Sequence, residues 1–123
     1  PAMPIKRILV VDDSPTERHV INDMLRRAGY EVISSDCAED AFSKAREMHP
    51  DLILMDVVMP GQNGFQATRT MSRDPSTCDI PVIMCTSKNQ ETDRIWALRQ
   101  GAKDYITKPV SREVLLRKIS ALG

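Results

Sequence analysis

Residues 5–17 read IKRILVVDDSPTE, a pattern typical of a strand that turns directly into a helix. The run Ile8–Val11 is short, continuous and aliphatic, as expected for a strand that is covered on both faces. The segment Ser14–Glu17 fits a capping box with proline at the first helical position. Between them lie Asp12 and Asp13, so the sequence predicts an acidic turn where the strand ends.

The same arrangement recurs along the chain. Asp56 follows an apolar run, as do Thr86 and the pair Lys108-Pro109. Strand-like and helix-like patterns alternate throughout, which favours an α/β fold. Strands are expected at 5–11, 31–33, 51–55, 80–85 and 105–107, and helices at about 14–29, 41–48, 64–71, 90–100 and 111–122.

Five βα units predict a (βα)5 flavodoxin-like, doubly wound, five-stranded parallel sheet of order 2-1-3-4-5. The chain has 123 residues, the size of one compact domain, and we assign residues 4–122 to it. Residues 1–2 precede Met3 and are interpreted as a cloning remnant.

Composition excludes several functional classes. Seventeen basic residues balance seventeen acidic ones, so the chain lacks the positive charge that nucleic-acid binding needs. The apolar runs are too short to cross a bilayer, and a cytoplasmic monomer is expected. Three cysteines without metal-ligand spacing are interpreted as reduced thiols.

Three aspartates are expected to converge at one edge of the sheet. In the predicted strand order the first and third strands are neighbours, so Asp12, Asp13 and Asp56 would meet where both strands end. Clustered carboxylates stay ionised together only if a cation compensates them, and hard oxygen ligands select Mg²⁺, with Mn²⁺ as the alternative.

Lys108 and Thr86 extend this site toward a phosphoryl group. An ammonium and a hydroxyl beside the metal would bind phosphoryl oxygens, and Asp56 is the candidate nucleophile because aspartyl phosphates are recognised covalent intermediates.

These residues resemble the receiver domain of bacterial two-component response regulators. The resemblance covers residues 4–122 and rests on the ordered set Asp12-Asp13, Asp56 with Met59-Pro60 and Gly64, Thr86, and Lys108-Pro109. It implies that Asp56 accepts a phosphoryl group from a histidine kinase. The domain would then catalyse only its own phosphorylation and dephosphorylation, and it is not expected to be an enzyme with a separate substrate.

The resemblance also implies individual roles. Asp13, Asp56 and the backbone carbonyl of Val58 would bind the metal directly, with Asp12 acting largely through water. Lys108 would contact the phosphoryl group, and the peptide bond between Lys108 and Pro109 would be cis. Thr86 and Tyr105 would form the switch that changes the surface of the fourth helix, fifth strand and fifth helix, where a downstream protein binds.

Further motifs narrow the resemblance. Residues 13–17, 64–69 and 90–96 are similar to stand-alone regulators of type IV pilus chemosensory systems, which control twitching motility. Family positions that tune dephosphorylation fall on Val58 and Lys88. An apolar Val58 cannot orient an attacking water, so self-dephosphorylation is expected to proceed without the help that an amide or acid would give there.

Other interpretations stay open at this point. A phosphate sink without its own output and a receiver fragment of a larger regulator share these motifs, although a stand-alone protein is favoured. A receiver that has lost phosphorylation and only binds a partner is disfavoured by the intact acidic set. A phosphatase of the haloacid dehalogenase type is disfavoured. Such enzymes carry an Asp-x-Asp motif after the first strand, and no acidic residue stands two positions after Asp12 or Asp56.

Trp96 lies at the boundary of the buried stripe expected for Ile95 and Leu98. It either packs partly into the core or anchors a partner. His19 and His49 are expected to be solvated.

Overall fold

The computed structural model describes residues 4–57, 63–86 and 91–122, with the backbone alone for residues 91–94. The strands are β1 (Arg7–Val11), β2 (Glu31–Ser35), β3 (Leu52–Asp56), β4 (Val82–Thr86) and β5 (Asp104–Thr107). The helices are α1 (Pro15–Arg27), α2 (Ala38–Met48), α3 (Gly64–Arg73), α4 (Glu91–Arg99) and α5 (Arg112–Leu122).

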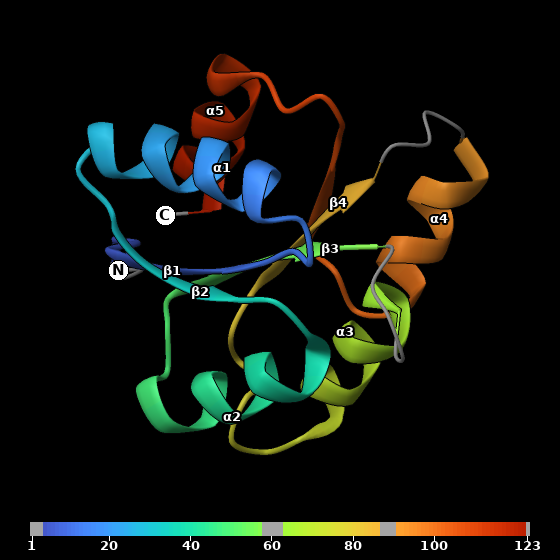
Figure 1. The fold of residues 1–123 in the computed structure, drawn as a ribbon. Helices are drawn as coiled ribbons and strands as arrows, with labels where there is room; N and C mark the ends of the chain where they lie inside the picture. The colour runs from blue at the N-terminus through green and yellow to red at the C-terminus, as the bar shows by residue number, and fades with distance from the viewer. Residues whose placement is uncertain (1–3, 58–62, 87–90, 123) are drawn as a thin grey trace.

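The five strands form one parallel sheet of order β2-β1-β3-β4-β5, which confirms the predicted fold (Figure 1). Residues of β1 lie opposite residues of both β2 and β3, so β1 and β3 are neighbours at the centre. The order reverses between these two strands, and ligands of open α/β sheets bind at such a point.

Helices cover both faces of the sheet. Helices α1 and α5 lie on one face, where Ile21, Leu25, Leu115 and Ile119 pack on the strands. Helices α2, α3 and α4 cover the other face, with small residues such as Ala41 and Ala67 at the contact. Strands β3 and β4 are buried along their whole length, as expected for a parallel sheet enclosed by helices.

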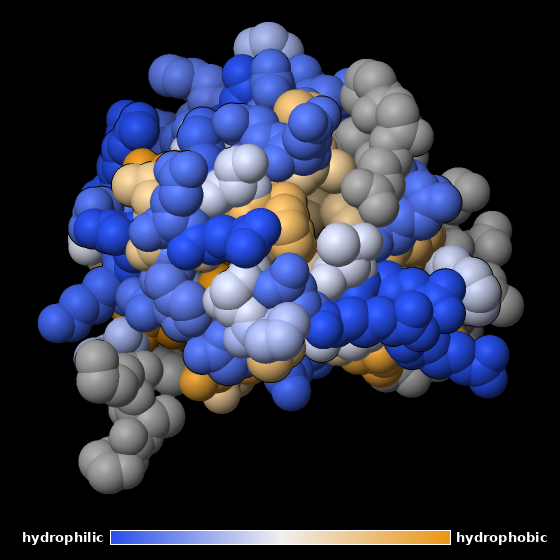
Figure 2. Space-filling model, turned by 90° about the horizontal axis from the view of Figure 1, so that it is seen from below, coloured by the Kyte–Doolittle hydropathy of each residue, from blue (hydrophilic) through white to orange (hydrophobic). Residues whose placement is uncertain are grey.

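One face of the molecule is seen in the space-filling view (Figure 2). The face shown in Figure 2 is largely hydrophilic, and its apolar areas are small and separated by charged or polar residues. Among the helices described, none has both the length and the apolar character needed to span a membrane.

One packing expectation is wrong. Ile95 and Leu98 were expected to face the core, but each residue is about 40% exposed, and Ala97 is buried instead. Trp96 is half exposed, and its ring meets Phe65 of α3 edge-on at a centroid distance of 6.4 Å. Ala97 is therefore the residue of this segment that packs in the core beneath the helix.

Candidate functional site

Three carboxylates meet where β1 and β3 end. One oxygen from each of Asp12, Asp13 and Asp56 lies within 4.8 Å of the others. Asp12 and Asp56 are buried, whereas Asp13 is exposed to solvent. The arrangement combines two enclosed ligand groups with one open to solvent, a geometry that suits a hydrated divalent cation.

Backbone contacts fix the orientation of Asp12. Its Oδ1 accepts a hydrogen bond from the Ser14 backbone N–H at 2.9 Å, so the turn into α1 holds the carboxylate. The Arg18 side chain donates to the Asp12 carbonyl oxygen at 2.7 Å. The N-terminal part of α1 therefore positions Asp12.

Lys108 joins the acidic cluster from β5. Its Nζ donates to Asp56 Oδ1 at 2.8 Å, to Asp12 Oδ2 at 3.0 Å and to Glu17 Oε2 at 2.7 Å. The backbone N–H of Lys108 donates to the Thr86 carbonyl at 2.6 Å, and the bond to Pro109 is cis. Strands β1, β3 and β5 and helix α1 thus meet at one ammonium group.

Burial governs the protonation of the two enclosed acids. Burial raises the pKa of Asp56, and the charges of Asp12 and Glu17 add to this effect while Lys108 opposes it. The pKa of Asp12 is also raised, again chiefly by burial and against the hydrogen bonds from Ser14 and Lys108. One ammonium therefore does not compensate these carboxylates fully, and the donor set fits a further cation.

Lys108 stays charged in this setting. Burial lowers the pKa of its ammonium, but the hydrogen bonds to Asp56, Glu17 and Asp12 outweigh burial and raise the pKa overall. The pKa of Glu17 is lowered, chiefly by its hydrogen bond to Lys108. The group that faces Asp56 is therefore a permanent cation at neutral pH.

The role of Glu17 differs from the one the sequence predicts. Ser14 caps α1 by accepting the Glu17 backbone N–H at 3.3 Å, and Pro15 opens the helix as expected. The Glu17 side chain, however, reaches Lys108, while the Ser14 N–H is bound by Asp12. The capping-box pattern did not predict this contact, because it is made with a lysine 91 residues away in the sequence.

Gly64 is required by its position behind Asp56. A Cβ atom at Gly64 would overlap the backbone carbonyl of Asp56, and the Gly64 N–H donates to the Val57 carbonyl at 2.8 Å. Only glycine lets α3 begin so close to the end of β3. The sequence motif thus has a steric cause.

The two predicted switch residues lie on β4, the strand next to Asp56, and on β5, the strand beyond it. Thr86 is buried at the end of β4, opposite Thr107 of β5. Tyr105 is half buried on β5, and the Lys118 Nζ lies 5.5 Å from the centre of its ring. Lys118 also binds Asp104 at 3.0 Å.

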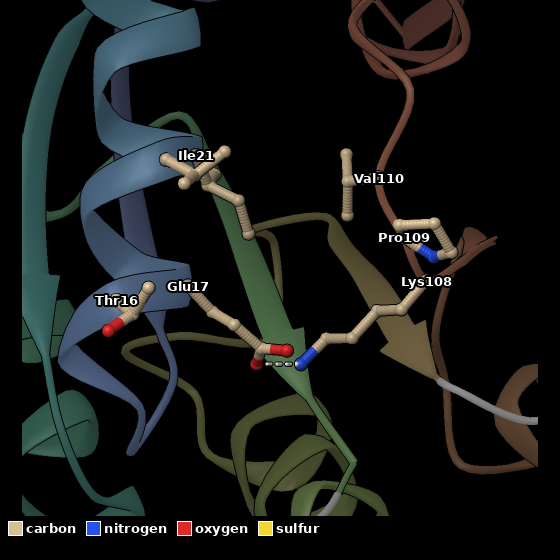
Figure 3. A pocket seen from close by; sticks show the side chains of 7 residues that line it. Thr16, Glu17, Ile21, Lys108, Pro109 and Val110 are labelled. Atoms are coloured by element: carbon tan, nitrogen blue, oxygen red, sulfur yellow. Dashed lines mark hydrogen bonds and ion pairs between the residues drawn. The ribbon is translucent and has the colours of Figure 1, made fainter.

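A hollow of about 220 Å³ lies beside Lys108, between α1 and the segment that follows β5. Glu17 and Lys108 form its polar wall, and Val20, Ile21 and Val110 supply apolar side chains. Figure 3 shows Glu17 extending from α1 to the Lys108 ammonium at this wall. Val58 and Lys88, the expected tuning positions, lie outside the described residues.

Comparison with known proteins identifies the family. Residues 8–120 match the response regulator receiver domain. The chain is 53% identical over 116 residues to protein PilH of Pseudomonas aeruginosa, covering 94% of this chain and 96% of PilH. It is 41% identical to the phosphate regulon transcriptional regulatory protein PhoB of the same organism, of which it spans about half.

Solved structures agree with this match. The chemotaxis response regulator CheY4 of Vibrio cholerae superposes with a TM-score of 0.90 at 28% identity, covering 97% of this chain and 99% of CheY4. The receiver domain of a sensor histidine kinase from P. aeruginosa superposes with a TM-score of 0.87 at 34% identity, covering 94% and 95%. That structure holds a magnesium ion in its active-site cleft.

The acidic site at the switch point of the sheet and these similarities have one explanation. The chain belongs to the receiver domain family of two-component response regulators.

Proposed function

We propose that this chain is a signalling switch in which Asp56 takes a phosphoryl group from a histidine kinase in the presence of Mg²⁺. Control by phosphorylation is general for receiver domains. The observation that carries the proposal for these residues is the acidic cluster, whose oxygens lie within 4.8 Å of one another, with Lys108 bound to Asp56 at 2.8 Å. Mn²⁺ satisfies the same oxygen ligands.

The transfer needs few covalent changes. An Asp56 oxygen forms a bond to phosphorus as the bond from phosphorus to the donor's imidazole nitrogen breaks, and the electron pair of that bond returns to the imidazole. Bound Mg²⁺ would neutralise carboxylate and phosphoryl charge, held by Asp13, Asp56 and the Val58 carbonyl, with Asp12 acting through water. Lys108 would donate to a phosphoryl oxygen. The chain modifies itself and would have no separate substrate.

The response would pass through β4 and β5 to the surface of α4, β5 and α5. Thr86 ends the strand next to Asp56, and Tyr105 lies on the strand beyond it. A phosphoryl group that binds the Thr86 hydroxyl favours one arrangement of this edge, and Tyr105 follows it inward. A downstream protein would distinguish the two surfaces.

The process we propose is twitching motility driven by type IV pili. The motifs at 13–17, 64–69 and 90–96 support this assignment, and so does the 53% identity to PilH over nearly its whole length. The balanced charge of the chain favours a protein target over nucleic acid. We propose that it acts in the cytoplasm as a monomer.

Phosphotransfer to wild type and Asp56→Asn tests the proposal. A phosphorylated histidine kinase or acetyl phosphate with Mg²⁺ should add one phosphoryl group to wild type, seen by intact-protein mass spectrometry. Asp56→Asn should gain none. Equal labelling of both proteins would remove Asp56 from the mechanism, and the absence of labelling in both would refute the phosphorylation switch.

Val58 offers a second test through the lifetime of the phosphoryl group. We propose that its apolar side chain gives an attacking water no help, so Val58→Asn should shorten the lifetime by about tenfold or more. The decay of phosphorylated protein after removal of the donor measures this rate. An unchanged rate would refute the role of Val58.

A further inference from the structure

We infer that Glu17 is a positioning residue. Its carboxylate binds Lys108 where a phosphoryl oxygen would bind, and it thereby restrains phosphorylation of Asp56. The inference rests on the proposed function and adds a residue to it. Its basis is the ion pair of 2.7 Å between Glu17 Oε2 and Lys108 Nζ, visible in Figure 3.

The hydrogen-bonding capacity of Lys108 is fully used. An ammonium carries three N–H donors, and Lys108 has three carboxylate partners, at 2.7, 2.8 and 3.0 Å. Only 13% of its side chain is exposed, so the three acceptors enclose it. A phosphoryl group on Asp56 brings new acceptor oxygens to this ammonium, and these oxygens compete with the present partners for its three donors.

Glu17 is the partner best able to leave. Asp12 is 1% exposed and bound by the Ser14 N–H, and Asp56 is the residue that carries the phosphoryl group. The Glu17 side chain is 48% exposed and lies on the wall of the 220 Å³ hollow, so rotation about its own torsions brings its carboxylate into solvent. Its departure leaves the buried framework of the site unchanged.

Charge acts in the same direction as this competition. Glu17 is a fourth carboxylate beside Asp12, Asp13 and Asp56, and it raises the negative potential that an anionic phosphoryl donor meets. Removing a half-exposed ion pair of this kind changes an equilibrium by about twofold to fivefold. We therefore expect that neutralising Glu17 raises the affinity for a phosphoryl group by about twofold to fivefold.

Titration with beryllofluoride, an analogue of the phosphoryl group, at saturating Mg²⁺ tests the inference without turnover. Glu17→Gln should bind it about twofold to fivefold more tightly than wild type, measured by isothermal titration calorimetry. Glu39→Gln is the matched control, since Glu39 is also an acid in the first turn of a helix, but on α2. It should bind like wild type.

Glu17→Asp separates contact from charge. The aspartate keeps the negative charge on α1 but is one methylene too short to hold Lys108, so it should also bind beryllofluoride more tightly than wild type. Wild-type affinity in both Glu17 variants, weaker binding in either, or a gain shared by Glu39→Gln would overturn the inference alone. No binding to wild type would overturn the proposed function together with it.

Discussion

Helices α1 and α4 are attached to the same sheet in different ways. Helix α1 buries Ile21, Asn22 and Leu25, and its first turn contacts the acidic site through Ser14 and Glu17. In the described part of α4, Ala97 is buried, while Ile95, Trp96 and Leu98 are 40–50% exposed. Large side chains hold α1 to the core, whereas among residues 95–99 of α4 only the small Ala97 is buried.

The difference matches the two tasks of a switch. The residues that we propose to bind the cation and the phosphoryl group would need a fixed framework, and α1 provides one. An element that changes position must have two arrangements separated by little free energy, and a helix with little buried apolar area meets that condition. We therefore expect α4 to respond to phosphorylation more readily than α1.

Leu25→Ala should give the largest loss of stability. Leu25 is fully buried against the sheet, so its truncation leaves a cavity and lowers the free energy of unfolding by about 3 kcal/mol. Urea denaturation followed by circular dichroism measures the change. A loss below about 1 kcal/mol would show that α1 is not anchored as described.

Asp56→Asn should stabilise the protein without divalent cations, by about 1 kcal/mol at pH 7. Burial raises the pKa of Asp56, so the folded state binds the proton more tightly than the unfolded chain. The ionised carboxyl therefore costs stability above its folded pKa, and the variant avoids this cost.

The gain from Asp56→Asn should shrink as the pH falls toward 3.8, the ordinary pKa of the group, because wild type is then protonated as well. Urea unfolding at several pH values measures this trend. A variant that is less stable than wild type at pH 7 would mean that the ion pair with Lys108 outweighs burial.

Leu98→Ala makes the same chemical change on α4 and should cost only about 0.5 kcal/mol, because Leu98 is 40% exposed. The same denaturation measurement compares it with Leu25→Ala. A loss as large as that of Leu25→Ala would abolish the distinction between the two helices.

The fluorescence of Trp96 tests the exposure of α4 without any substitution. Its half-exposed ring should be quenched strongly by acrylamide in the unphosphorylated protein, since the contact with Phe65 covers only part of it. Fluorescence at increasing acrylamide concentration measures this access. Strong protection would mean that Trp96 packs into the core and is no anchor for a partner.

The sequence predicted the fold and the acidic site because both follow from local patterns. Apolar runs that end in Asp12, Asp56 and Lys108 place these residues at one edge of any parallel sheet. Strand order then decides which residues meet, and the predicted order is confirmed.

Two features escaped prediction because they depend on contacts between distant residues. Glu17 matched a capping pattern, and its actual partner Lys108 is remote in sequence. In α4, apolar spacing alone favoured Ile95 and Leu98 as core residues, whereas Ala97 is the one that is buried. For Glu17 and for α4, contacts between residues distant in sequence determined the structure, and the short-range sequence pattern did not.

Binding of Mg²⁺ to wild type and Asp13→Asn, followed by isothermal titration calorimetry, tests most directly whether the acidic cluster holds a cation. Asp13 is the exposed member of the cluster, so its replacement should leave the fold intact, with an unchanged circular dichroism spectrum. Wild type should bind one Mg²⁺, and Asp13→Asn should bind it at least about tenfold more weakly. Equal affinity in the two proteins would contradict a shared metal site at this edge of the sheet.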